Sequence, residues 1–180
     1  FLEKIGRIPI FIPNTFSNIQ LFLDELNLDG LILSGGDNIG KYPERDETEN
    51  FLLKYAIAKK IPVLGICRGM QLINKFYGGS IIETTNKKHV KINHQINLSK
   101  PIKEDLILVN SYHNNILTNN SLGNNLKSFA VCDFDNTIEG IFHESNKIIG
   151  IMWHPERSQD DFNKKLIIKI FVENMFWKKI

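Results

Sequence analysis

The stretch PVLGICRGMQLI, residues 62–73, decides the fold of this chain. Its apolar first part predicts a buried strand over residues 62–66, and the part that follows has the spacing of a helix. Cys67 stands at the junction, with Gly65 two residues before it and Gly69 two residues after it. A glycine-x-nucleophile-x-glycine pattern between a strand and a helix is typical of a sharp turn that exposes a reactive side chain.

The predicted turn would give Cys67 a chemical environment of its own. Glycines tolerate the close contacts and strained backbone angles that such a turn imposes. The first N–H groups of the helix predicted over residues 68–77 lie beside the sulfur, and we expect them to lower the thiol pKa and to stabilise an oxyanion. The alternative is an inert, buried cysteine, and this motif alone does not decide between the two.

Strands and helices alternate before this motif. Short apolar runs predict strands over residues 8–12 and 30–34, and helical spacing predicts helices over residues 16–26 and 46–60. This alternation indicates a parallel sheet with helices on both faces. The opening FLEKI has the character of a last helical turn, so we expect a first strand and most of a first helix to precede Phe1.

The pattern changes in the second half of the chain. Apolar runs between turn residues predict further strands over residues 106–109, 126–132, 137–143 and 148–153. A closing amphipathic helix is predicted over residues 160–177. The fold class is therefore α/β, with a mainly parallel sheet and an antiparallel extension. The polar residues 84–102 predict a loop, whose basic part, residues 87–91, is either a solvated surface or a rim that attracts an anionic substrate.

Length and composition exclude several classes of function. The chain has 180 residues, the usual size of one domain, and we expect residues 1–180 to form a single domain. A formal net charge of +2 argues against a nucleic-acid partner. No apolar stretch has the length of a membrane span. Two cysteines make no disulfide framework, and without a signal-peptide pattern we expect a cytoplasmic protein.

A second motif strengthens the interpretation of Cys67. The apolar run of residues 148–153 leads directly into His154, Pro155 and Glu156. An imidazole at a strand end, with a carboxylate two residues later, suits a general base and the group that orients it. Taken alone, the pattern would indicate an edge histidine beside a surface glutamate. Together with Cys67 it predicts a catalytic triad, and no cofactor or metal is expected because no Cys/His cluster has metal-ligand spacing.

Four motifs together resemble the class I glutamine amidotransferase superfamily, and within it the γ-glutamyl hydrolase branch. They are SGGDN, PVLGICRGMQ, VNSYHN and GIMWHPE, in the expected order. The resemblance implies a flavodoxin-like three-layer sandwich and a small-molecule γ-glutamyl substrate. It implies that Cys67 is the nucleophile, His154 the general base and Glu156 the third triad member.

The same resemblance implies the surrounding site. The implied oxyanion hole consists of Gly35, Gly36 and the backbone N–H of Arg68. The implied glutamyl pocket is a set of polar and aromatic residues: Gln71, Asn110, Ser111, Tyr112 and His113. The remaining histidines and Cys132 are interpreted as ordinary polar or core residues.

Arg68 and the residues after the NSYH motif bear on the substrate. An arginine directly after the nucleophile resembles γ-glutamyl-γ-aminobutyrate hydrolases, and we hypothesise that its guanidinium pairs with Glu49 rather than facing solvent. Those enzymes usually continue with His-Gln, whereas Asn114 and Asn115 follow here. The NSYHN motif with an RD-x-x-E helix is instead similar to γ-glutamyl-CDP-amidate hydrolases of bacterial surface-polysaccharide clusters, such as those for capsule.

Three functions remain open at this point. The first is a hydrolase of a γ-glutamyl conjugate that forms a Cys67 thioester. The second is a glutaminase subunit that delivers ammonia to a synthase partner. The third, of another class, is a catalytically silent binding protein of the same fold. A homodimer is compatible with each of them.

Overall fold

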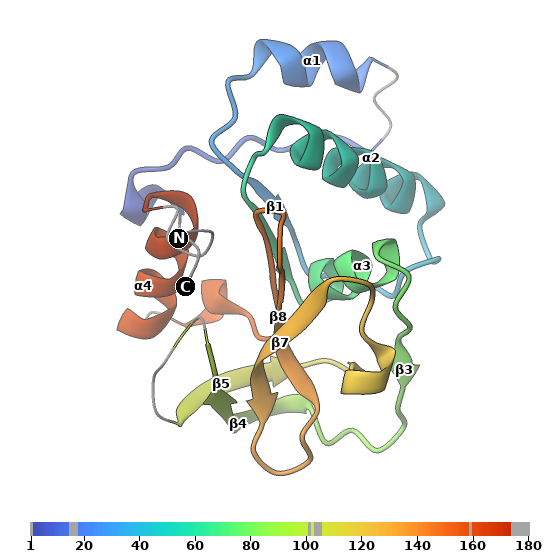
Figure 1. Ribbon diagram of the computed structural model, residues 1–180, viewed down its shortest axis with the longest axis vertical. Helices are drawn as coiled ribbons and strands as arrows, with labels where there is room; N and C mark the ends of the chain where they lie inside the picture. The colour runs from blue at the N-terminus through green and yellow to red at the C-terminus, as the bar shows by residue number, and fades with distance from the viewer. Residues whose placement is uncertain (1, 15–17, 101, 103–105, 159, 174–180) are drawn as a thin grey trace.

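A computed structural model of the chain describes residues 2–14, 18–100, 102, 106–158 and 160–173 (Figure 1). Its centre is a curled seven-stranded sheet with the strand order β1-β2-β9-β8-β7-β4-β5. The strands are β1 (Leu31–Leu33), β2 (Val63–Ile66), β4 (Val90–Leu98), β5 (Ile107–Tyr112), β7 (Leu126–Cys132), β8 (Ile138–His143) and β9 (Ile148–Ile151). Two short strands, β3 (Ile82–Glu83) and β6 (Asn115–Ile116), pair separately.

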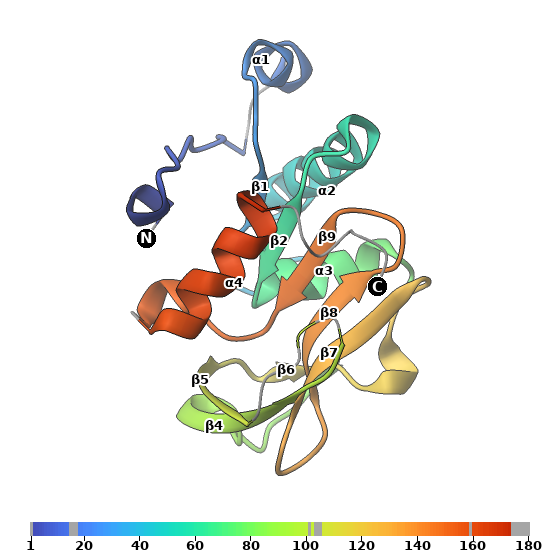
Figure 2. The ribbon, with the colours of Figure 1, turned by 60° about the vertical axis from the view of Figure 1, so that its left-hand side comes forward.

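The sheet has a parallel half and an antiparallel half, as predicted. β1, β2 and β9 pair in parallel, and every residue of β2 and β9 is buried. Burial on both faces explains why these strands are continuous apolar runs. β8 pairs antiparallel with β9, and β7, β4 and β5 continue the antiparallel half away from the helices (Figure 2).

Helices cover both faces of the parallel half. The α-helices among the described residues are α1 (Ile19–Glu25), α2 (Pro43–Lys59), α3 (Arg68–Phe76) and α4 (Asp161–Phe171). α2 and α3 lie on one face and α4 lies on the other, which gives the expected three layers (Figures 1 and 2). None of the helices in the described part of the chain is long and apolar enough to cross a membrane.

Helix boundaries differ from the prediction for local reasons. α2 begins at Pro43, three residues earlier than predicted, because a proline suits the first helical turn, where its missing N–H costs nothing. α4 begins after Asp160, whose side chain accepts a hydrogen bond from the Asn163 N–H. Predicted helical residues 16–17 and 174–177 lie outside the described residues.

The predicted strand over residues 8–12 is wrong. These residues form no ladder in the structure, and the side chains of Ile8 and Phe11 are 89% and 90% exposed. β1, the outermost strand at this edge of the sheet, pairs with β2 alone. An apolar β-branched segment needs a neighbouring strand to complete its backbone hydrogen bonds, and here none of the described residues lies beside it as a strand.

The predicted loop over residues 84–102 is wrong for residues 90–98. The nine residues of β4 lie inside this range and pair with both β5 and β7. Their polar composition conceals an alternation in which His94 and Ile96 are buried while Gln95 between them is exposed. An antiparallel strand with one solvated face keeps such polar residues, so composition alone suggested a loop.

Candidate active site

The turn between β2 and α3 places Cys67 at the carboxyl end of the parallel strands. Cys67 has φ 50° and ψ −104°, a conformation that is unfavourable for any residue with a side chain. Gly69 follows in the first turn of α3, where a Cβ atom would lie 2.1 Å from the Leu33 carbonyl oxygen. Close contact between α3 and β1 therefore requires a glycine at this position, and the strained turn presents the Cys67 side chain to the cavity described below.

The end of β9 positions His154 and Glu156. The chain enters a short 3-10 turn, Pro155–Arg157, directly after His154, which brings the Glu156 carboxylate back to the imidazole. Nδ1 of His154 lies 2.7 Å from Oε1 of Glu156. The Asn110 side chain of β5 accepts a hydrogen bond from the His154 N–H (2.9 Å) and donates one to the His154 carbonyl oxygen (2.8 Å). These two bonds fix the backbone of His154 to the sheet.

Cys67 and His154 both lie beside Gly35. A Cβ atom on Gly35 would be 2.8 Å from Cε1 of His154 and 3.7 Å from Cβ of Cys67. Any larger residue at this position would collide with the imidazole. The glycine after β1 thus leaves a space that both the imidazole and the thiol border.

Burial and hydrogen bonds shift the pKa values of Cys67 and Glu156. Desolvation raises the pKa of the Cys67 thiol to about 11, and the hydrogen bond with the Arg68 backbone offsets this only in part. The backbone N–H at the start of α3 does lower the thiol pKa, as predicted, but burial outweighs this effect and the net pKa lies above its ordinary value. Burial also favours the neutral form of Glu156, but hydrogen bonds from His154 and from its own backbone prevail and lower its pKa. Glu156 is consequently an anion that can accept a hydrogen bond from the Nδ1–H group of His154.

The raised thiol pKa predicts slow alkylation of Cys67 at neutral pH. Because only the thiolate reacts, the iodoacetamide rate should rise about tenfold per pH unit from pH 7 to pH 10, while pH stays below the pKa. Mass spectrometry of the Cys67 peptide measures this rate. A Cys132→Ser background is used because burial also raises the pKa of Cys132 to about 11, so its alkylation would respond to pH in the same way. A rate that is already constant above pH 7 would contradict the prediction.

A cavity of about 340 Å³ opens next to Cys67. Its walls are Gly36, Asp37, Asn38, Lys41, Cys67, Gln71, Tyr112, His113, Asn114 and Asn115. Of the residues predicted for the glutamyl pocket, three line it: Gln71, Tyr112 and His113. The exposed lysines of residues 87–91 do not line it, and its single lysine, Lys41, is held 2.9 Å from Asp37.

Two predicted pocket residues are bonded elsewhere in the protein. Asn110 holds the backbone of His154, and the Ser111 hydroxyl donates to the His89 carbonyl oxygen at 2.8 Å. Alternation along β5 explains the position of Ser111, which faces the side of the sheet opposite to Tyr112, whereas Asn110 shares the face of Tyr112 and is taken up by the His154 backbone. Asn115 was not predicted for the site, yet its amide donates to Oε1 of Gln71 (3.4 Å) and to Oδ1 of Asn38 (3.1 Å). One hint of this role was present in the sequence: Asn114 and Asn115 stand where the γ-glutamyl-γ-aminobutyrate hydrolases usually have His-Gln.

The predicted partner of Arg68 is confirmed, and a second partner joins it. The buried Arg68 guanidinium pairs with both Glu49 and Asp46 on α2. Glu49 also accepts a hydrogen bond from Arg45 Nε at 2.8 Å. Arg45 in turn donates from Nη2 to the Gly35 carbonyl oxygen at 3.1 Å. This network connects the start of α3 to the loop at Gly35, which lies next to both Cys67 and His154.

Comparisons with known proteins agree on one family. The sequence profile of the glutamine amidotransferase class-I family matches residues 2–174. The gamma-glutamyl-CDP-amidate hydrolase of Campylobacter jejuni is 34% identical over 148 residues, which cover 79% of this chain and 68% of that protein. A subunit of the glutamine-hydrolyzing GMP synthase from Methanococcus maripaludis is 29% identical over 175 residues, covering 95% of this chain and 84% of that protein.

A solved structure has the same fold. A crystal structure from Thermoplasma acidophilum, of a protein described as a candidate subunit of GMP synthase, superposes with a TM-score of 0.76. The match covers 94% of this chain and 82% of that chain, at 22% sequence identity.

Proposed function

This chain belongs to the class I glutamine amidotransferase family, and from that premise we propose that it hydrolyses a γ-glutamyl amide through Cys67, His154 and Glu156. The family and the C. jejuni hydrolase relative support a hydrolase-type enzyme. One observation carries the proposal: Cys67 and His154 border the same space beside Gly35, and His154 Nδ1 lies 2.7 Å from Glu156.

The first half of the reaction forms a thioester. Nδ1 of His154 is engaged with Glu156, which leaves Nε2 to accept the proton of the Cys67 thiol. The sulfur attacks the γ-carbonyl carbon of the substrate, and the carbonyl oxygen becomes an oxyanion. When the C–N bond breaks, Nε2 returns the proton to the departing nitrogen, leaving a γ-glutamyl thioester on Cys67. Because burial raises the pKa of the free thiol, proton transfer to His154 has to precede or accompany the attack.

The second half of the reaction releases glutamate. His154 accepts a proton from water, the resulting hydroxide attacks the thioester carbonyl, and the Cys67 sulfur leaves and regains the proton. Each oxyanion would lie between the Gly35–Gly36 segment and the backbone N–H of Arg68, at the start of α3. N–H groups aimed at such a position stabilise developing negative charge. The balance is one amide and one water consumed, with one glutamate and one amine formed.

The cavity next to Cys67 supports recognition of the glutamyl group. Gln71 and Asn115 present amide groups to it, and such groups suit the α-amino and α-carboxylate ends of glutamate. Tyr112, the last residue of β5, and His113 also line the cavity. The C. jejuni relative supports a γ-glutamyl-CDP-amidate or another γ-glutamyl conjugate as the substrate of this chain.

The methanococcal relatives support a second candidate function, a glutaminase that passes ammonia to a synthase partner. The two functions differ in their leaving group. A conjugate hydrolase works alone and prefers a large amine, whereas a coupled glutaminase releases ammonia from glutamine and depends on its partner.

A substrate comparison separates the two functions. Glutamate release would be measured for γ-glutamyl-CDP-amidate, γ-glutamyl-γ-aminobutyrate and glutamine with the isolated protein. We expect the kcat/KM of one conjugate to exceed that of glutamine by about 100-fold, since binding energy from the leaving group lowers the barrier. Glutamine as the best substrate would instead favour the synthase-linked function. No release from any of the three by the folded, isolated protein would contradict the conjugate hydrolase and leave only a glutaminase that needs its partner.

A further inference from the structure

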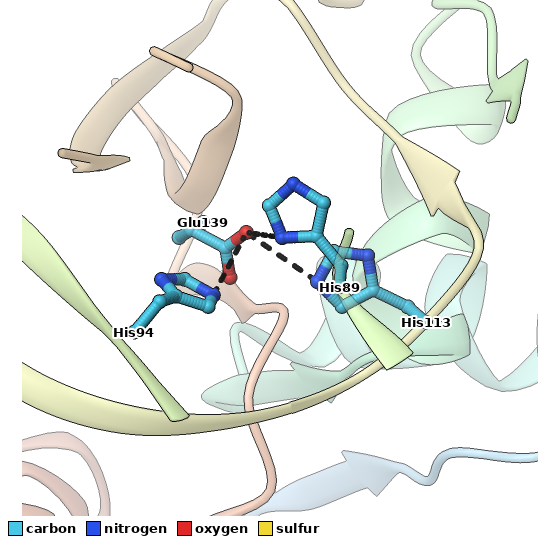
Figure 3. A group of neighbouring side chains, drawn as sticks. All are labelled: His89, His94, His113 and Glu139. Atoms are coloured by element: carbon cyan, nitrogen blue, oxygen red, sulfur yellow. Dashed lines mark ion pairs between the residues drawn. The ribbon is translucent and has the colours of Figure 1, made fainter. Parts of the chain in front are cut away.

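Three histidines and one glutamate converge in the antiparallel half of the sheet, apart from the triad (Figure 3). Oε1 of Glu139 lies 3.4 Å from Nε2 of His113, 3.7 Å from Nδ1 of His89 and 3.7 Å from Nε2 of His94. The three histidine side chains are 2% exposed and that of Glu139 is fully buried. None of the three facing nitrogens, and neither carboxylate oxygen, has a hydrogen-bond partner among the described residues. Buried polar atoms without partners are costly, so this group calls for an explanation.

The opposite nitrogen of each imidazole does have a partner. Nε2 of His89 lies 2.9 Å from an Asp135 carboxylate oxygen. Nδ1 of His113 lies 2.9 Å from the Asn115 carbonyl oxygen, and Nδ1 of His94 lies 3.3 Å from that of Gln95. Carboxylate and carbonyl oxygens only accept hydrogen bonds, so in a neutral imidazole these outer nitrogens carry the proton. The inner nitrogens then direct three lone pairs at the lone pairs of a carboxylate.

Such an arrangement is repulsive unless a proton or a metal cation lies between the groups. The possible ligand atoms of His89, His94, His113 and Glu139 all lie within 4.8 Å of one another. Around tetrahedral Zn²⁺, with bonds of about 2.0–2.1 Å, neighbouring ligand atoms are about 3.3 Å apart. The outer hydrogen bonds of the imidazoles are those that orient metal-bound histidines. We propose that these four side chains bind one divalent transition-metal ion, with zinc as the best fit.

The ligand set indicates a structural ion. Four buried protein ligands complete a tetrahedral shell, and a closed shell leaves no position for substrate. His89 precedes β4, His94 lies within it, His113 follows β5 and Glu139 belongs to β8. The ion would therefore fasten the β4–β5 pair to β8. Because His113 also lines the cavity next to Cys67, metal binding would stabilise one wall of the candidate active site.

The spacing of the ligands along the chain gave no indication of this site. The ligands occur at four separated positions of the chain, and antiparallel pairing alone brings them together. The prediction that no metal is needed rested on the absence of a compact Cys/His motif. That absence says nothing about ligands contributed by different strands.

Metal content tests the proposal directly. Untagged protein would be dialysed against ZnCl₂, passed over a desalting column and assayed for zinc by mass spectrometry. We expect about one zinc ion per chain, a lower melting temperature after chelation, and the intense visible absorption of tetrahedral Co²⁺ after cobalt substitution. Glu139→Gln and His94→Gln should each weaken zinc binding at least about tenfold, since each removes one of four ligands.

Cys132→Ser is the matched control. Cys132, His89 and Asp135 form a second group whose atoms could hold a metal, so this variant distinguishes the two clusters. It should bind zinc as the unmodified protein does. Wild-type protein without bound zinc, or binding that Cys132→Ser removes and Glu139→Gln spares, would overturn the proposal. The cobalt spectrum needs no variant, so a misfolded variant leaves the test intact, and no substrate is required, so the result is independent of the proposed hydrolase activity.

Discussion

Replacing Cys67 by alanine should reduce glutamate release from a γ-glutamyl conjugate by at least about 10⁴-fold in kcat/KM. The proposed thioester cannot form without the sulfur, and loss of a nucleophile removes most of the rate enhancement of such a triad. The small side chain should leave substrate binding intact, because the other cavity walls are unchanged. Coupled detection of glutamate gives the rate, and calorimetry with intact substrate gives the affinity.

Cys132→Ser is the control for this experiment. Both cysteines are buried and free, but Cys132 lies in β7 and does not line the cavity next to Cys67. The control should keep its activity, and rapid acid quenching of wild-type protein during turnover should reveal a γ-glutamyl adduct on the Cys67 peptide. Equal glutamate release by Cys67→Ala and wild-type protein would refute the proposed mechanism.

Replacing Glu49 by alanine should cause the largest loss of stability. Glu49 lies between two arginines, accepting from Arg45 at 2.8 Å and pairing with Arg68. Its removal leaves the buried Arg68 with Asp46 alone. Breaking a buried ion pair on one side costs about 3–5 kcal/mol. For a chain of this size the melting temperature should fall by about 10 °C, which calorimetry or circular dichroism measures.

The same substitution should lower activity in the folded protein. Without Glu49, Arg45 no longer holds the Gly35 carbonyl firmly. Gly35 lies next to Cys67 and His154, so the alignment of these two residues for catalysis is disturbed. Glu144→Ala is the matched control, because it removes a carboxylate that pairs with Lys127 at 2.7 Å on the exposed surface. Exposed pairs contribute little, so this control should melt as wild type does. An unchanged melting temperature for Glu49→Ala would contradict the structural role of the network.

Local patterns were sufficient for strands β1, β2 and β9 of the parallel half, though not for residues 8–12, and for the two motifs of the candidate site. Residues 63–66 are apolar throughout because both faces of β2 are covered, and the glycines around Cys67 follow from one turn. The contact between His154 and Glu156 is likewise local, since two residues of one short turn meet. In each case the chemistry depends on neighbours within a few positions along the chain.

Contacts between distant segments were not predictable in the same way. Polar β4 appeared to be a loop because its hydrogen bonds come from β5 and β7. Asp46 joined Arg68 because α2 packs beside α3, and the Cys67 thiol became less acidic because the surrounding protein excludes water. Asn110 was expected to bind substrate, but it holds His154 from a strand 44 positions away.

The amino-acid sequence by itself determined the family, the mixed parallel and antiparallel sheet, and the residues proposed as nucleophile, base and orienting carboxylate. The tertiary structure alone decided which groups lie together: the two carboxylates on Arg68, Cys67 and the His154 imidazole beside Gly35, and the three imidazoles around Glu139. The reason is physical. Backbone periodicity and turn chemistry act over a few residues, whereas desolvation, ion pairing and metal coordination depend on distances in space that only the packed sheet and helices set.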